Sequence, residues 1–138
     1  MSATKVNIET TIGAPLQKVW DFWNKPEHIT QWNFAIDTWH CPSAKNDLRV
    51  GGKLQSRMEA KDGSFGFDFE GTYNEVLEHK RIVYTIADGR RVETDFSEAG
   101  GKTKIATVFE AETQNPVEMQ KGGWQAILDN FKKYAEAN

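Results

Sequence analysis

Aromatic side chains are the residues of this sequence that could build a binding site. The chain of 138 residues holds eight Phe, five Trp and three Tyr, but only five leucines. Flat rings can wall a pocket for an apolar or aromatic molecule, because such pockets are mostly apolar with a few polar groups. Filling a core is the commoner role for any single ring. The candidate cavity lining consists of nine rings and two other apolar side chains: Trp23, Trp32, Trp39, Phe67, Phe69, Tyr84, Phe96, Trp124, Phe131, Met119 and Leu128.

Paired carboxylates are the second type of residue that could do chemistry. Two acids near each other can act as acid and base if burial separates their pKa values. Asp68 and Glu70 share one face of an alternating segment, and Glu59 lies on the segment before it. The other face of that segment carries three phenylalanines, so we expect the carboxylates on the outer, solvated surface.

Histidine, cysteine and serine offer no recognisable catalytic or metal pattern. His28, His40 and His79 lack the spacing of zinc ligands, and a strand would point the neighbours His40 and Cys41 to opposite faces. No histidine has an orienting partner in the sequence. Ser64 lacks the G-x-S-x-G pattern, and neither Gly-Gly-Lys segment fits a phosphate-binding loop. We therefore expect no catalytic residue, no metal and no cofactor, and we favour a binding protein over an enzyme.

Charge and hydropathy limit the classes of partner. The chain has 17 basic and 20 acidic residues and a net charge of -3, so it lacks the basic excess of nucleic-acid-binding proteins. No apolar run approaches the roughly 20 residues of a membrane span, and the first residues lack the apolar core of a signal peptide. The single Cys41 favours a reducing compartment. We expect a cytoplasmic protein, monomer or homodimer, without nucleic acid partner or membrane insertion.

Hydrophobic periodicity predicts the elements that would position the rings. Alternation over residues 5–12 predicts a first strand, and two short helices follow after Pro15 and Pro26. Alternating runs between short turns then predict an antiparallel meander of about six strands, which includes a short strand near Thr38–Cys41. A bulge near Gly71 would reverse which side chains face inward.

The last predicted element is a long helix with an apolar stripe. Asn115-Pro116-Val117-Glu118 has the form of a capping box, with Asn115 as the N-cap. Gly122-Gly123 in its first half predicts a bend or a close backbone approach, or a pair packed against the sheet. Such a helix can cover the apolar face of the sheet, and large rings can leave a cavity beneath it.

Several segments carry a family resemblance in the right order along nearly the whole chain. They are Ile12–Trp20, Pro26–Trp32, Gly51–Leu54, Gly71–Val76 with Arg81–Tyr84, and Gly123–Phe131. These segments resemble the helix-grip superfamily of START-type lipid-transfer domains, polyketide cyclases and the birch pollen allergen. Within it, they are similar to the branch named after the C-terminal domain of the heat-shock-protein-90 ATPase activator. The resemblance implies a single α+β domain over residues 1–138, with a curved antiparallel sheet wrapped around a long C-terminal helix.

Three functions are compatible with this fold. The first is the binding of a small hydrophobic molecule, lipid-like or aromatic, between the sheet and the C-terminal helix, oriented by Tyr84, Trp39 or His40. The second is a protein-interaction module resembling the chaperone ATPase activator, which would use the outer sheet face and residues 34–48. The third is a cyclase- or hydrolase-like enzyme, which would need an acid, a base or a histidine facing the rings.

Overall fold

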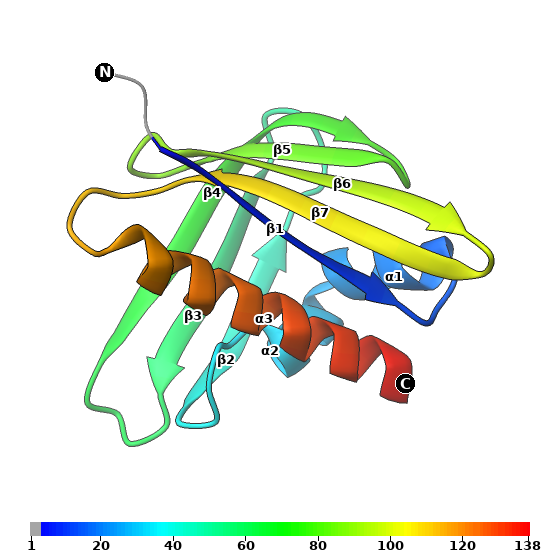
Figure 1. The fold of residues 1–138 in the computed structure, drawn as a ribbon. Coiled ribbons are helices and arrows are strands. Elements are labelled where there is room, and N and C mark those ends of the chain that lie inside the picture. The colour runs from blue at the N-terminus through cyan, green and yellow to red at the C-terminus, as the bar shows by residue number, and fades with distance from the viewer. Residues whose placement is uncertain (1–3) are drawn as a thin grey trace.

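Seven antiparallel strands form one curled sheet, and the long helix α3 crosses its concave side (Figure 1). The computed structural model describes residues 4–138. In chain order the elements are β1 (Lys5–Ile12), α1 (Leu16–Asn24), α2 (Pro26–Trp32), β2 (Trp39–Asn46), β3 (Lys53–Ala60), β4 (Gly66–Leu77), β5 (Arg81–Ile86), β6 (Arg91–Ala99), β7 (Lys102–Glu110) and α3 (Val117–Ala137). The predicted α+β order of strand, two helices, six strands and helix is confirmed.

The strands follow the order β1-β7-β6-β5-β4-β3-β2 across the sheet. Consecutive strands from β2 to β7 are neighbours because short turns join them, and β1 pairs with β7 at the other edge. The turn between β5 and β6 places Gly89 at a φ of 95°, a left-handed conformation that glycine adopts without strain. Because β1 pairs with β7, the N-terminal strand lies beside the strand that precedes α3 (Figure 1).

Two bulges interrupt the regular pairing of the strands, one in β4 and one in β2. The bulge in β4 lies between Tyr73 and Glu75, beyond Gly71, so the inward alternation runs unbroken from Phe67 to Tyr73. The strand predicted near Thr38–Cys41 is longer, because β2 continues past a bulge between His40 and Ser43. That bulge contains Pro42, which has no N–H for the ladder.

The helices close one end and the concave side of the sheet. Leu128, Phe131 and Ala135 form the buried stripe of α3, and its backbone lies against β1. The ring of Phe131 packs edge-on against Trp23 of α1 and Trp32 of α2, with centroid distances of 5.0 and 4.8 Å. The three helices therefore share one aromatic core. None of them is long and apolar enough to cross a membrane.

The predicted capping box does not form. Pro116 has an extended backbone with ψ at 141°, so α3 begins at Val117 and the Asn115 side chain makes no cap. The side-chain amide of Gln120 instead ties the loop before α3 to the first turn of the helix. Its oxygen accepts from the N–H of Glu112 at 2.9 Å, and its nitrogen donates to the carbonyls of Glu112 and Asn115 at 3.0 and 2.8 Å.

Gly122 and Gly123 do not mark a close approach. No atom outside the helix's own local backbone lies within 4 Å of a Cβ placed at either position. The pair therefore neither touches the sheet nor approaches another backbone, so these two interpretations of the sequence are wrong, whereas a bend of the helix stays a prediction. Nothing around them requires glycine.

Candidate ligand-binding cavity

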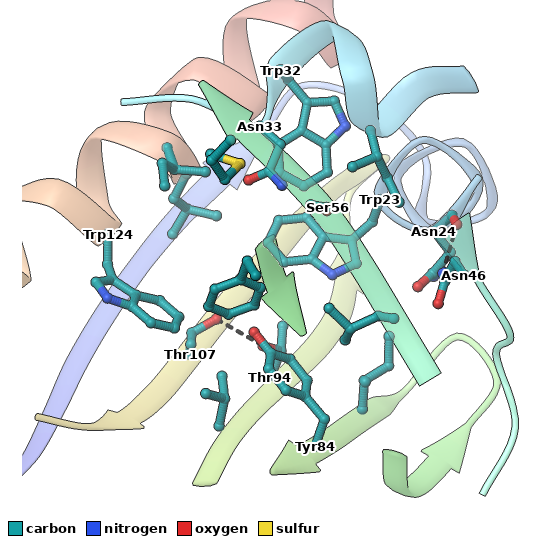
Figure 2. A pocket seen from close by; sticks show the side chains of 18 of the residues that line it. Trp23, Asn24, Trp32, Asn33, Asn46, Ser56, Tyr84, Thr94, Thr107 and Trp124 are labelled. Carbon is teal, nitrogen blue, oxygen red and sulfur yellow. Dashed lines mark hydrogen bonds between the residues drawn. The ribbon is translucent and has the colours of Figure 1, made fainter. Parts of the chain in front are cut away.

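A cavity of about 340 Å³ lies between the concave face of the sheet and α3 (Figure 2). All ten elements contribute at least one side chain to its wall. The sheet supplies alternate residues of its strands, since successive side chains of a strand point to opposite faces. Phe67, with 43% of its surface exposed, and the exposed Lys45 mark an opening to solvent.

Seven of the eleven residues predicted to line a cavity lie in this wall: Trp23, Trp32, Phe67, Phe69, Tyr84, Trp124 and Leu128. They come from α1, α2, β4, β5 and α3, elements that lie far apart along the chain. The alternation of side chains along β4 and the apolar stripe of α3 bring them together. Whether these residues bind a ligand stays a prediction.

The other four predicted residues lie outside the wall. Phe96 and Phe131 are buried behind it, where both rings pack edge-on against the cavity-facing Trp23. Trp39 lies beside Phe65 and Phe67 at the outer end of the β3–β4 hairpin, with centroid distances of 5.9 and 6.1 Å. Met119 is 62% exposed because it belongs to the first turn of α3, which points this side chain into solvent.

Two tryptophans at opposite sides of the cavity are held in fixed orientations. Trp32 stacks on Trp23 at 5.0 Å, and its indole N–H donates to the carbonyl of Phe22 at 2.9 Å. Trp124 stacks on Phe109 at 4.2 Å with nearly parallel rings, and Phe69 meets it edge-on at 6.2 Å. Rings fixed by their neighbours lose little freedom when a ligand binds.

A chain of hydrogen bonds satisfies the polar groups at one side of the cavity. The hydroxyl of Tyr73 donates to the side-chain oxygen of Asn46, whose nitrogen donates to the carbonyl of Asn24 at 2.7 Å. The Asn24 amide in turn donates to the carbonyl of Trp20 at 2.9 Å. Burial raises the pKa of Tyr73, so the phenol stays protonated at neutral pH.

Thr94 and Thr107 place a second set of polar groups on the cavity floor. These buried residues are cross-strand partners on β6 and β7, and their hydroxyls lie 3.0 Å apart (Figure 2). Sequence reasoning missed both. The sequence pattern predicts their inward position, because Val92-x-Thr94-x-Phe96 and Ile105-x-Thr107-x-Phe109 place each threonine on the same strand face as its apolar neighbours.

Tyr84 brings a third polar group to the wall. Among the described residues, its hydroxyl makes no hydrogen bond. Burial raises the pKa of Tyr84, as does the neighbouring Tyr73, while the guanidinium of Arg90 acts in the opposite direction. The other two groups predicted to orient a ligand, Trp39 and His40, are not in the wall.

Among residues 4–138, no acidic or histidine side chain lines the cavity. Asp68 and Glu59 pair with Arg57 on the outer face at 3.5 and 2.7 Å, and Glu70 accepts from Gln55 at 3.1 Å. The expectation that these carboxylates lie on the outer surface is confirmed.

The histidines and the cysteine serve other contacts. The Nε2 atom of His40 lies 3.7 Å from the carboxylate of Glu59. The Nδ1 atom of His28 lies 2.6 Å from the hydroxyl of Tyr134. The ring of His79 packs edge-on against Trp20. Burial raises the pKa of the Cys41 thiol, which makes it a poor nucleophile. Within residues 4–138, no group of three or more His, Cys, Asp or Glu residues could hold a metal ion.

Comparisons with known proteins agree with this architecture. The model of a family described as "Activator of Hsp90 ATPase homolog 1-like protein" matches residues 13–136. The solution structure of an AHSA1-like protein from Aeromonas hydrophila is 43% identical to this chain, with a TM-score of 0.92. A protein from Cytophaga hutchinsonii, also solved in solution, is 48% identical with a TM-score of 0.83. Both alignments cover 97% of this chain and 93% of the other.

A more distant structure shares the fold alone. The crystal structure of a protein from Chromobacterium violaceum is 21% identical, with a TM-score of 0.85 over 97% of this chain and 98% of that one. No curated protein matches the chain.

Proposed function

The chain belongs to the family of Activator of Hsp90 ATPase homolog 1-like proteins, and we propose that it binds a small hydrophobic molecule in its cavity. The observation that carries this proposal is the cavity of about 340 Å³ itself. This volume falls within the range of about 300–1,000 Å³ typical of small-molecule sites. Its wall is mostly aromatic and aliphatic, as such sites require, and it includes a few convergent hydroxyl and amide groups.

Desolvation of the ligand supplies the affinity in this proposal. Each Å² of apolar ligand surface removed from water contributes about 25 cal/mol, and the ordered tryptophan rings keep the entropic cost of binding low. Both a flat aromatic molecule and a short alkyl chain fit such a wall. A cytoplasmic location, proposed from the single buried Cys41, would give the protein access to metabolites of either kind.

A pair of tryptophan variants tests the proposal. Trp124→Ala removes a ring that lines the cavity, whereas Trp39→Ala removes one that lies outside it. Titration with naphthalene and with decanoic acid, followed by isothermal calorimetry, is expected to show weaker binding for Trp124→Ala and unchanged binding for Trp39→Ala. Circular dichroism confirms that each variant is folded. Equal losses in both variants, or no binding by the unmodified chain, would contradict the proposal.

Interaction with a chaperone is the second candidate function, favoured by the family and by an exposed aromatic cluster. Phe65 and Phe67 are 63% and 43% exposed beside Trp39, at the tip of the β3–β4 hairpin. Exposed rings gathered in this way are typical of protein-interaction surfaces. The test is capture of purified Hsp90 and its ATPase rate, with Phe65→Ser as the variant expected to abolish both effects. A chaperone that is neither captured nor stimulated by the unmodified chain would exclude this function.

A further inference from the structure

Some polar groups of the cavity are hydrogen-bonded within the protein, and others have a donor hydrogen without an acceptor among the described residues. Tyr73 and Asn46 belong to the first group. Thr94 and Thr107 share a single hydrogen bond, although each hydroxyl carries one proton. One of these two protons therefore lacks an acceptor among the described residues, as does the proton of the Tyr84 hydroxyl. Hydrogens of this kind favour a ligand that brings acceptor oxygens.

The charges in the wall favour the same kind of ligand. In the part of the chain that the structure describes, the cavity is lined by the cationic residues Lys45 and Arg90 and by no Asp or Glu. Lys45 is exposed at the rim and has no ion pair among residues 4–138. A cationic ligand would lose its water there and find no carboxylate in the wall, whereas an anion would meet the ammonium of Lys45 and the guanidinium of Arg90, whose Nε is already paired with Asp88.

Arg90 has a free edge for such an anion. Its Nε donates to the half-exposed Asp88 at 2.8 Å, and its Nη1 donates to the carbonyl of Glu110 at 3.3 Å. These two bonds fix the guanidinium plane with the side chain only 22% exposed. Nη2 makes no hydrogen bond with the described residues, so its protons remain for a ligand.

Arg90 and Tyr84 belong to the same corner of the sheet. Tyr84 of β5 is the cross-strand partner of Val92 on β6, two residues after Arg90. The N–H of Ile86 bonds to the Arg90 carbonyl at 2.7 Å and closes the turn between the two strands. Both side chains line the cavity, and the charge of Arg90 acts to lower the pKa of the Tyr84 phenol.

We propose that the ligand is an apolar carboxylic acid whose carboxylate is bound by the Tyr84 hydroxyl and the free edge of Arg90. This inference rests on the proposed function and specifies its ligand class. The hydrocarbon part lies among the tryptophans, and the carboxylate accepts charge-assisted hydrogen bonds at the β5–β6 corner. The acid is discriminated from the corresponding amine because the described residues of the wall offer cations and hydroxyls but no carboxylate.

Two matched series of probes test the proposal. 2-Naphthoic acid, naphthalene and 2-naphthylmethylamine share an aromatic body, and decanoic acid and decylamine share an alkyl body. Titrations of the unmodified chain at neutral pH are expected to show each acid binding at least tenfold more tightly than its amine. 2-Naphthoic acid is also expected to exceed naphthalene by about tenfold.

Three variants locate the effect. Tyr84→Phe and Arg90→Gln are each expected to weaken 2-naphthoic acid by about tenfold while leaving naphthalene unchanged. Arg91→Gln is the control, because this neighbouring side chain pairs with Glu93 and does not line the cavity. It should leave both affinities unchanged.

The outcomes separate this inference from the proposed function. Amines that bind as tightly as acids, or a Tyr84→Phe variant that weakens acid and hydrocarbon equally, would overturn the carboxylate assignment while leaving a hydrophobic site. If no probe of either series bound, both proposals would fail.

Discussion

Tyr73 and Tyr84 allow one substitution to be compared at two neighbouring positions with opposite expected results. They are cross-strand partners on β4 and β5, both line the cavity, and their rings meet edge-on at 6.2 Å. Only the hydroxyl of Tyr73 has a protein acceptor, the side-chain oxygen of Asn46. Tyrosine to phenylalanine removes a single oxygen, so packing of the ring is nearly unchanged and the hydroxyl contribution is isolated.

The two variants should differ in stability by about the value of one buried hydrogen bond. Tyr73→Phe leaves the Asn46 oxygen without its donor in a part-buried site, which costs about 1–2 kcal/mol. Tyr84→Phe breaks no protein hydrogen bond, so its free energy of unfolding should stay within about 0.5 kcal/mol of the unmodified chain. For a domain of this size, the first change corresponds to a fall in Tm of roughly 3–7 °C.

Urea denaturation followed by circular dichroism measures both changes at pH 7. Unchanged m-values would show that the midpoints report stability and not a different unfolded state. If Tyr84→Phe were as destabilising as Tyr73→Phe, its hydroxyl would have a partner inside the folded protein. The assignment of a free donor to the cavity would then be refuted.

Three further predictions concern alkaline pH, the C-terminal helix and the start of α1. Because burial raises the pKa of both cavity tyrosines in the folded state, stability is fully present below their ordinary pKa of about 10 and falls as the pH rises beyond it. Urea midpoints at pH 8, 10 and 11 should decrease in that order, and a constant midpoint would contradict the burial. Gly122→Ala and Gly123→Ala should each stabilise the chain by about 1 kcal/mol, since both sites are helical and unobstructed. Gly71→Ala is the contrasting control, because its Cβ would lie 2.8 Å from a ring carbon of Tyr84; destabilisation by all three would contradict the account. Glu98 accepts from the N–H of Leu16 at 2.8 Å, so Glu98→Ala should lower the free energy of unfolding by about 1 kcal/mol, whereas Glu98→Gln should keep most of the stability. Equal melting temperatures of the two variants would argue against this cap.

The sequence predicts the architecture well because local patterns determine it. Alternation between short turns identifies the strands, and strand parity alone is enough to place Phe69 on the inward face. The periodicity of α3 does the same for Trp124 and Leu128. Met119 lies five residues before Trp124, which is about 140° around the helix from that ring, so the same periodicity predicts its exposed position.

The polar groups of the cavity depend on contacts that no local pattern encodes. Asn46 and Tyr73 are 27 residues apart, and their bond requires the register of three strands as well as the bulge in β2. Thr94 and Thr107 share the inward parity of their apolar neighbours, but their pairing depends on the β6–β7 register. The sequence predicts a cavity but not its volume, because that volume is the difference between the space enclosed by the sheet and the volume of the rings inside it.

The binding of a small hydrophobic molecule is tested most directly by NMR with the isotope-labelled chain and unlabelled 2-naphthoic acid. A ligand in the cavity is expected to give saturable intermolecular NOEs to the ring protons of Trp23 and Trp124, which line it, and none to Trp39, which lies outside it. The absence of saturable NOEs, or NOEs to Trp39 alone, would contradict it.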